Sequence, residues 1–186
     1  EIDGVVTYRL ELTDPVDAAG YRFRPGQFNM MYLPGAGEAA ISLSGDPVSP
    51  ESLIHTVRTA GNVTRGLAAL RVGDTIGLRG PYGSSWPVED CLSRDVVIVT
   101  GGIGLPPLRP LIYTLLARPE QYGRLHLLYG ARTPETQMYP AEYDSWIERG
   151  LMMHTTVDRS APGYTGNVGV VPLLLDRLKT FDPKTA

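Results

Sequence analysis

Cysteine is almost absent from this sequence, and so are long apolar runs and any excess of positive charge. The 186 residues include one cysteine, Cys91, and three histidines. A single cysteine excludes a disulfide within the chain, and with three scattered histidines it argues against a four-ligand zinc or iron–sulfur site. We therefore predict no metal ligands here, and this cysteine usage favours a cytoplasmic location.

The charge and hydropathy patterns exclude further classes of protein. The formal net charge is −3, so the sequence indicates neither a nucleic-acid partner nor an anionic membrane partner. No apolar run reaches the ~18 residues that a membrane-spanning helix needs, and residues 1–4 lack the basic and apolar regions of a signal peptide. Hydrophobic residues make up 42% of the chain, which is typical of a folded protein of one or two domains.

The first half of the chain is dense in turn residues and short β-like runs. The whole sequence holds 21 glycines and 16 prolines. Between them we predict strands at 5–12, 28–33, 40–43, 53–58 and 75–78, and a short helix at 64–70. Many short strands at this spacing are typical of an antiparallel β-barrel or sandwich.

After Pro87 the rhythm changes to longer alternating elements. Apolar runs predict strands at 95–99, 125–129 and 152–157, and each is followed by a helical pattern, at 107–117, 140–150 and 170–178. The order β-α-β-α-β-α is the signature of a parallel, doubly wound sheet. We place the boundary at 86–94, which gives domains 1–88 and 95–186.

A glycine-rich loop joins the first buried strand of the second half to its helix. It runs Thr100-Gly101-Gly102-Ile103-Gly104-Leu105-Pro106-Pro107. Glycines let the backbone approach a pyrophosphate closely, and the helix N-terminus beyond them offers N–H groups and a partial positive charge. The alternative is a tight strand-to-helix turn with no ligand.

The run from Val99 to Pro110 resembles the NAD(P) loop of the ferredoxin–NADP reductase superfamily. It is most similar to the gamma, flavin-binding subunits of cytoplasmic NiFe hydrogenases and sulfhydrogenases and to the related subunit of anaerobic sulfite reductase. The resemblance implies that Thr100 faces the nicotinamide as a catalytic residue. It also implies a dinucleotide site made by Thr100, Gly101, Gly102, Ile103, Gly104 and Pro106.

Motifs of the first half resemble the flavin barrel of the same superfamily, in the same order. They are Arg24-Pro25-Gly26-Gln27-Phe28, residues 37–44, His55-Thr56-Val57-Arg58, Gly61-Asn62-Val63-Thr64 and Arg79-Gly80-Pro81-Tyr82-Gly83. The resemblance implies an FAD-binding antiparallel β-barrel. The implied flavin-binding residues are Ala40, Ile41, Ser42, Leu43, His55, Thr56, Val57, Gly61, Asn62, Val63 and Thr64.

Two hydroxyl residues carry the predicted flavin chemistry. Ser42 is expected to hydrogen-bond the flavin near N5, where hydride arrives, and so to act as a catalytic residue. Thr64 is expected to begin a helix and to donate its hydroxyl to a phosphate. The alternatives are a polar strand residue and a plain helix cap. We assign His55 no acid–base role, because hydride transfer between two rings needs none.

The sequence departs from the superfamily at its R-x-Y-S motif. The arginine and tyrosine positions fall on Ala39 and Ile41, so the flavin loses a guanidinium at its pyrophosphate and an aromatic cover. Arg58 is a candidate for the missing charge. Hydrogenase gamma subunits vary at these positions too, which points to that branch.

The end of the second predicted strand bears on the choice of nicotinamide cofactor. The first charged residue there is Arg132, which could meet a 2′-phosphate. The alternative is a solvated arginine before the turn that opens at Thr133. The sequence therefore favours NADP(H) over NAD(H).

Together these motifs predict an electron-transfer flavoprotein that moves electrons between NAD(P)H and iron–sulfur partner subunits through FAD. The implied partners are the iron–sulfur and catalytic subunits of a NiFe hydrogenase-like or sulfur/sulfite reductase complex. We expect the first barrel strand, the end of the NAD(P) domain and a segment carrying a 2Fe–2S cluster to lie outside this sequence. Rival hypotheses are the reductase component of an oxygenase, the electron-transfer subunit of dihydroorotate dehydrogenase, and a non-catalytic scaffold with a decayed flavin site.

Overall fold

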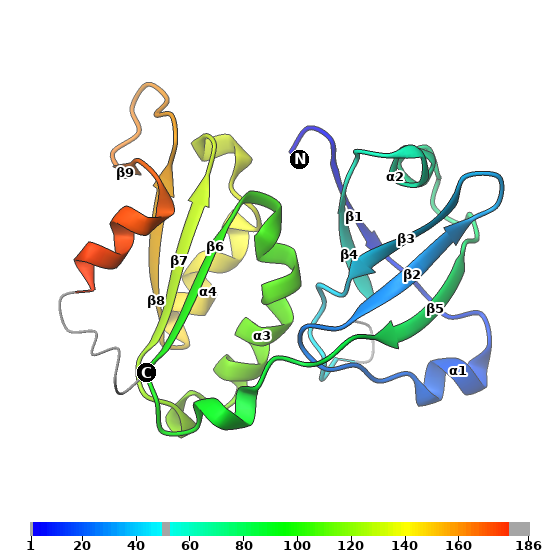
Figure 1. The fold of residues 1–186 in the computed structure, drawn as a ribbon, viewed down its shortest axis with the longest axis horizontal. Coiled ribbons are helices and arrows are strands. Elements are labelled where there is room, and N and C mark those ends of the chain that lie inside the picture. Colours follow the sequence, from blue (N-terminus) through cyan, green and yellow to red (C-terminus); the bar gives the residue numbers. More distant parts are fainter. Residues whose placement is uncertain (1, 50–52, 179–186) are drawn as a thin grey trace. The chain divides into compact units, whose positions relative to one another are not determined.

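The computed structural model of this protein describes residues 2–49 and 53–178. This part of the chain divides into two compact units (Figure 1). Unit 1 contains the chain up to Trp86 together with Pro106–Leu111, and unit 2 contains Pro87–Leu105 and the chain from Ile112. The two units differ in the kind of sheet they contain.

Unit 1 is built from two antiparallel sheets. One pairs β1 (Val5–Arg9) with β4 (Ile54–Arg58), and the other places β2 (Phe28–Leu33) between β3 (Gly37–Ser42) and β5 (Gly77–Tyr82). The prediction of an antiparallel first half is confirmed. All five predicted strands are present, β2 with the predicted bounds and the other four with shifted ends. Leu43 and Ser44 then leave β3 and pair with β4, so the two sheets meet there.

Two short helices belong to unit 1, where the sequence predicted one. The helix that was not predicted, α1 (Pro15–Gly20), begins at Asp14, whose carboxylate accepts the N–H groups of Val16 and Asp17 at 2.7 and 3.2 Å. The other, α2 (Asn62–Ala68), begins two residues before the predicted Thr64. It starts at Gly61 because Thr64, in its first turn, reaches back to the N–H groups of Ala60 and Gly61.

The apolar core of unit 1 lies between the sheets and is completed by α2. Phe23, Leu43 and Leu53 form a buried cluster, with Tyr21 and Leu78 packed against it. On α2, Leu67 is fully buried. A side-chain carbon at Gly66 would lie 2.5 Å from Leu33 Cδ2, so α2 rests directly on the end of β2.

Unit 2 contains the predicted parallel sheet. Its strands are β6 (Val96–Gly101), β7 (Leu125–Ala131), β8 (Leu151–Val157) and β9 (Asn167–Val168), in the spatial order 6-7-8-9. Every residue of β7 is buried, as expected for a parallel strand covered on both faces. The two-residue strand β9 was not predicted.

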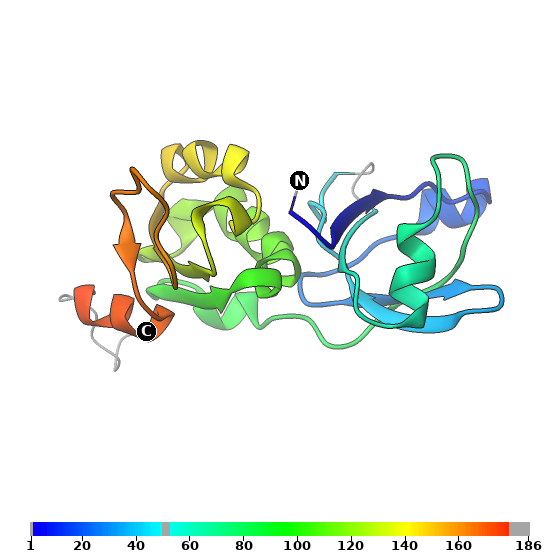
Figure 2. The same ribbon diagram turned by 90° about the horizontal axis from the view of Figure 1, so that it is seen from above.

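Helical segments lie on both faces of this sheet. The longest are α3 (Leu105–Ala117), α4 (Tyr143–Glu148) and η6 (Val171–Arg177), and Figure 2 shows α4 and η6 on opposite sides. Short 3-10 turns are η1 (Val88–Cys91), η2 (Gly102–Gly104), η3 (Pro119–Gln121), η4 (Pro134–Thr136) and η5 (Pro140–Glu142). The predicted helix 140–150 is therefore η5 followed by α4. The predicted third helix is the 3-10 helix η6.

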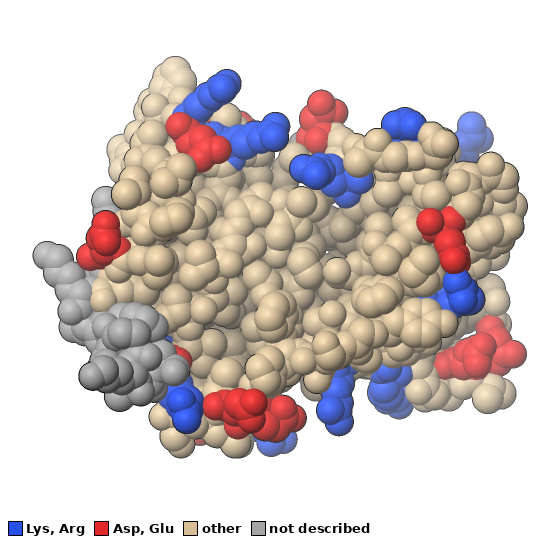
Figure 3. Space-filling model, in the orientation of Figure 1, with Lys and Arg blue, Asp and Glu red and all other residues tan. Residues whose placement is uncertain are grey.

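The face of the sheet beneath η6 is only partly covered. Leu128 and Leu174 are buried there, and the partly buried Val97 and Val171 pack against them. Val99 and Met152 belong to the same face by strand alternation, and they remain 47% and 46% exposed. In Figure 3 the face of unit 2 turned to the viewer carries its charged side chains mainly at the margins. No helix within residues 2–49 and 53–178 is long and apolar enough to cross a membrane.

Candidate functional site

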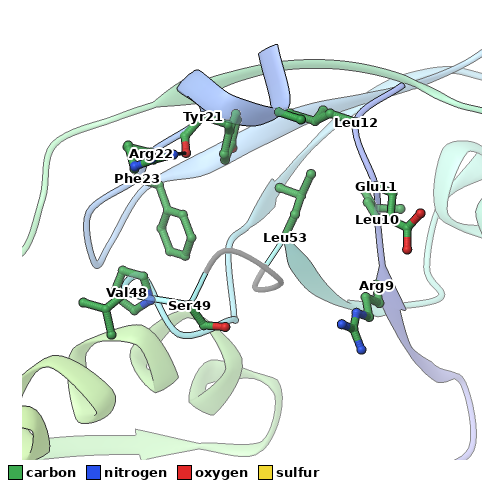
Figure 4. Close-up of a pocket in the computed structure, with 12 residues that line it drawn as sticks. Arg9, Leu10, Glu11, Leu12, Tyr21, Arg22, Phe23, Val48, Ser49 and Leu53 are labelled. Atoms are coloured by element: carbon green, nitrogen blue, oxygen red, sulfur yellow. Dashed lines mark hydrogen bonds between the residues drawn. The ribbon is translucent and has the colours of Figure 1, made fainter. Parts of the chain in front are cut away.

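A cavity of about 490 Å³ opens in unit 1 beside β1 and α1 (Figure 4). Its walls combine apolar side chains with a few charged ones: Arg9, Leu10, Glu11, Leu12, Ala18, Tyr21, Arg22, Phe23, Pro47, Val48, Ser49 and Leu53. The residues predicted to bind flavin or nucleotide are not among them. The predicted flavin site is therefore a different surface of unit 1.

The predicted flavin residues come from three elements: β3 and β4, which meet where the two sheets join, and α2, which lies against the other end of β3. Ala40, Ile41 and Ser42 end β3, and Leu43 forms a bridge with His55 of β4. The N–H of Ser44 donates to the carbonyl of Ile54 at 2.8 Å. From α2, Val63 lies against Gly37, where an added Cβ would be 3.7 Å from Val63 Cγ2. The fold thus places segments of β3, β4 and α2 that are separate in the sequence along one side of β3.

Ser42 is the residue of this group whose hydroxyl is best placed for a ligand. Its side chain is half-buried, and within the described part of the chain its hydroxyl makes no hydrogen bond to protein. Its carbonyl is engaged, because it accepts a hydrogen bond from His55 Nδ1 at 2.9 Å. The peptide is therefore fixed while the hydroxyl stays available.

The three predicted residues of β4 lie behind the surface. His55, Thr56 and Val57 are all buried. Thr56 Oγ1 is 3.0 Å from Thr7 Oγ1 and 3.3 Å from Ser44 Oγ. These side chains support the surface from within, and only their backbones are near it.

Burial also sets the charge of His55. Removal from water lowers its pKa to about 4, although the carbonyls of Ser42 and Ile41 favour the protonated ring. The imidazole is consequently neutral at neutral pH.

The Thr64 hydroxyl is already used at the start of α2. It accepts the N–H groups of Ala60 and Gly61 at 2.8 and 2.9 Å and is 3.1 Å from the carbonyl of Gly61, to which it donates. The alternative considered from the sequence, a capping role, describes these contacts better than a phosphate contact. Of the residues predicted to bind flavin in this turn, Gly61 and Asn62 are exposed.

Arg65 was missed by sequence reasoning and lies over the same turn. Its Nη1 donates to the carbonyl of Ala60 at 3.0 Å, and its Nη2 donates to Asn62 Oδ1 at 2.7 Å. These bonds hold a guanidinium across the start of α2, beside the residues predicted to bind flavin. The signal in the sequence was an arginine directly after Thr64, whereas the arginine that we had considered, Arg58, is exposed at the end of β4.

In unit 2 the predicted nucleotide loop lies between β6 and α3, as expected. Thr100 and Gly101 end β6, and η2 supplies Gly102, Ile103 and Gly104. Gly102 has φ of +51°, and no atom lies within 4 Å of a Cβ added there, so this position is open. At Gly104 an added Cβ would lie 2.5 Å from Thr100 Oγ1, so this glycine lets the threonine hydroxyl approach the backbone.

The N-terminus of α3 offers fewer donors than the sequence suggested. Pro106 and Pro107 occupy its first turn and carry no N–H. The N–H of Leu105 donates to the carbonyl of Gly102. Donors for an anion must therefore come from the backbone of 102–104, which follows the strand, and less from the helix itself.

Tyr129 of β7 contacts this loop, and the sequence analysis did not predict it as a site residue. Its ring is fully buried, and its hydroxyl accepts the N–H of Met138 at 2.9 Å. The same hydroxyl lies 3.5 Å from the carbonyl of Gly102, a long contact. Burial raises the pKa of Tyr129, so the phenol remains protonated.

Arg132 lies directly beyond β7, at the carboxyl edge of the sheet. It is exposed, and its carbonyl accepts the N–H of Arg159 at 2.9 Å. Arg159 follows β8, so two arginines occupy neighbouring strand ends. Asp158 lies beside them, with its N–H donating to the carbonyl of Ala131 at 2.9 Å, and charges of both signs are therefore present at this edge.

Comparisons with known proteins agree with this architecture. No family model matches the sequence. Sulfhydrogenase 1 subunit gamma of Pyrococcus furiosus is 29% identical over 172 residues, covering 89% of this chain and 58% of that protein. A probable dihydroorotate dehydrogenase B (NAD(+)) electron transfer subunit of the same organism is 34% identical over 160 residues, covering 86% and 57%. The chain thus spans a little over half the length of these relatives.

The fold also resembles those of solved reductase structures. A ferredoxin NADP⁺ reductase from Neisseria gonorrhoeae, with bound FAD and NADP, superimposes with a TM-score of 0.77 at 18% identity, covering 98% of this chain and 76% of that one. At this identity the likeness concerns the fold alone. The chain therefore has a ferredoxin reductase-like fold, and its sequence is similar to sulfhydrogenase gamma subunits and to electron transfer subunits of dihydroorotate dehydrogenase.

Proposed function

We propose that this chain is the flavin- and nicotinamide-binding part of an electron-transfer oxidoreductase. In this proposal the domain at 1–88 binds FAD, the domain at 95–186 binds NAD(P)H, and a hydride passes between the two cofactors. The observation that carries the proposal is the loop from Thr100 to Gly104, at the carboxyl end of β6 in a parallel sheet, with open space beside Gly102.

The residues present fit these cofactors. The hydroxyls of Ser42 and Thr100 make no hydrogen bond to protein within the described ranges, so each can bind a ligand. A flavin supplies the chemistry that links two-electron hydride transfer to one-electron carriers, and a protein supplies binding and orientation. In this chain Ser42 would donate to the flavin ring, Arg65 would neutralise part of its pyrophosphate, and Thr100 would contact the nicotinamide.

The partners follow from the sequence relatives and are part of the proposal. One relative is a sulfhydrogenase gamma subunit and another is an electron transfer subunit, which supports a role in a redox complex with iron–sulfur and catalytic subunits of NiFe hydrogenase type. A 2Fe–2S cluster outside the present sequence belongs to the same proposal and is tested by the iron and sulfide content of the purified assembly. A dihydroorotate dehydrogenase complex is the alternative that the second relative favours.

The flavin is tested by the purified full-length protein. We expect it to be yellow and to release about one FAD per chain on denaturation. The reason is that the chain offers a ligand both the open Ser42 hydroxyl, proposed for the flavin ring, and the start of α2, proposed for the pyrophosphate. Chromatography of the extract identifies the flavin. A protein that holds no flavin and takes none up on incubation with FAD or FMN would refute the proposal and favour the scaffold hypothesis.

We propose further that the nicotinamide cofactor is NADP(H), on the basis of Arg132. Arg132→Ala should weaken the use of NADPH about tenfold more than that of NADH, because one charge-assisted contact to the 2′-phosphate is lost. The measurement is kcat/KM for both cofactors. Arg159→Ala tests the neighbouring arginine, and Arg118→Ala, at the other end of α3, removes the same charge from a distant place. Equal losses with both cofactors would argue against a 2′-phosphate role.

A further inference from the structure

A chain of buried hydrogen bonds crosses the interior of unit 1 and ends at Ser42. Asn29 of β2 and His55 of β4 are both fully buried. His55 Nδ1 lies 2.9 Å from the carbonyl of Ser42, and His55 Nε2 lies 3.1 Å from Asn29 Nδ2. Tyr21 donates its hydroxyl to Asn29 Oδ1 at 2.7 Å. Side chains from separate segments of the chain thus form one continuous path.

The chemistry of these groups allows one arrangement of protons. A carbonyl only accepts, so Nδ1 of His55 must carry the proton that is donated to Ser42. The low pKa of His55 keeps the ring neutral, which leaves Nε2 as an acceptor. Asn29 therefore turns its NH₂ group to the histidine and its oxygen to Tyr21. All donors point the same way along the path, and such chains strengthen each bond.

The fold makes room for this path at one position. A Cβ at Gly80 would lie 2.0 Å from Asn29 Oδ1. Gly80 has φ of +150°, a backbone conformation that glycine tolerates. The glycine of the Arg79-Gly80-Pro81-Tyr82-Gly83 motif thus lets the Asn29 side chain lie against the backbone of β5.

The end of the path coincides with the junction of the two sheets. Beyond Ser42 the backbone leaves β2 and β3: the N–H of Leu43 donates to the carbonyl of Gln27 at 3.0 Å, and the N–H of Ser44 to that of Ile54 at 2.8 Å. The bond from His55 therefore fixes the peptide at which the chain changes sheets. That peptide belongs to the residue whose hydroxyl is open to a ligand.

We propose that His55, oriented by Asn29, is a positioning residue of the flavin site: it fixes the Ser42 peptide and so holds the Ser42 hydroxyl at the flavin ring. The inference rests on the proposed function. It gives His55 a role other than contact with the cofactor. It also explains how a site without the superfamily arginine and tyrosine, at Ala39 and Ile41, keeps its serine in a defined place.

Two substitutions of His55 separate its two hydrogen bonds. The amide of asparagine reaches the place of Nδ1, so His55→Asn keeps the donor to Ser42. The amide of glutamine reaches the place of Nε2, so His55→Gln keeps the contact with Asn29 and loses the donor. Should the glutamine variant not fold, His55→Met replaces it, because it fills the space and leaves no unpaired polar atom of its own.

The experiment measures two properties of the full-length protein and its variants. The first is the dissociation constant of FAD, with the visible circular dichroism of the bound flavin. The second is the hydrogen exchange of the Leu43 and Ser44 amides in the flavin-free protein. We expect the asparagine variant to resemble the parent within about threefold. In the glutamine or methionine variant the dissociation constant and the exchange rates should rise about tenfold, as the loss of one net hydrogen bond allows.

Each outcome decides the inference. Equal behaviour of the asparagine and glutamine variants would overturn the inference, since a purely space-filling role does not depend on which of the two hydrogen bonds is kept. Faster exchange with unchanged flavin binding would overturn the positioning role. A parent protein that binds no flavin would refute the proposed function itself, and with it this role, while the exchange pattern would still show whether the Ser42 peptide is held by His55.

Discussion

Replacing Gly102 by valine is expected to slow reduction of the bound flavin by NAD(P)H roughly a hundredfold or more, equivalent to about 2.7 kcal/mol, and to leave the flavin in place. Gly102 has φ of +51° and open space where a side chain would stand. A branched side chain would occupy that space and cover the N–H groups of 102–104 that we propose for the pyrophosphate. Stopped-flow bleaching of the flavin band gives the rate.

A matched variant separates this effect from backbone strain. Gly150 also has a positive φ, +107°, with nothing within 4 Å of an added Cβ, and it lies between α4 and β8. Gly150→Val should cost stability comparably and leave the rate unchanged. Dithionite needs no nucleotide site and should reduce both variants at the parent rate. Normal bleaching of the Gly102 variant by NAD(P)H would show that this loop does not bind the nucleotide.

Much of the fold could be predicted because its strands leave strong local patterns. The buried run at β6 and the glycine and proline turns of unit 1 each mark an element directly. The elements that were missed depend on single contacts: α1 on the Asp14 cap, and β9 on pairing of two residues with β8. The start of α2 was misplaced because a threonine in the first turn can cap a helix from within.

The candidate site likewise contains residues that a local motif predicts and residues that only the folded structure shows. Thr100 and the glycines after it follow from a contiguous motif at a strand end, so sequence reasoning finds them. The side chains of Asn29 and Tyr129 contact distant parts of the chain: Asn29 contacts His55, and Tyr129 contacts the carbonyl of Gly102. In the sequence each reads as one more residue of a strand. Only the register of the strands shows which polar side chains share the interior.

Buried, neutral His55 is also expected to make the protein markedly less stable toward acid. Its pKa is lowered by burial to about 4 in the folded protein, against 6.5 for an ordinary histidine. Above pH 6.5 the ring is neutral in both the folded and the unfolded protein, so its protonation costs the folded state no stability there. As the pH falls toward 4 the unfolded chain gains a proton and the folded chain does not, so the free energy of unfolding decreases. The gap corresponds to a loss on the order of 3 kcal/mol.

Burial lowers the pKa of His55, and Nε2 faces no acceptor that would offset the loss of water. The groups that face the ring are the NH₂ of Asn29, the carbonyls of Ser42 and Ile41, and Tyr8, which is its partner on β1. A proton on Nε2 would point at another donor in a dry interior. Urea unfolding of the parent and of His55→Asn between pH 7 and 4 isolates the effect, because carboxyl groups titrate alike in both proteins. Parallel stability curves would mean that His55 takes up its proton in the folded state at an ordinary pH, and that the arrangement of protons inferred for Tyr21, Asn29 and His55 is wrong.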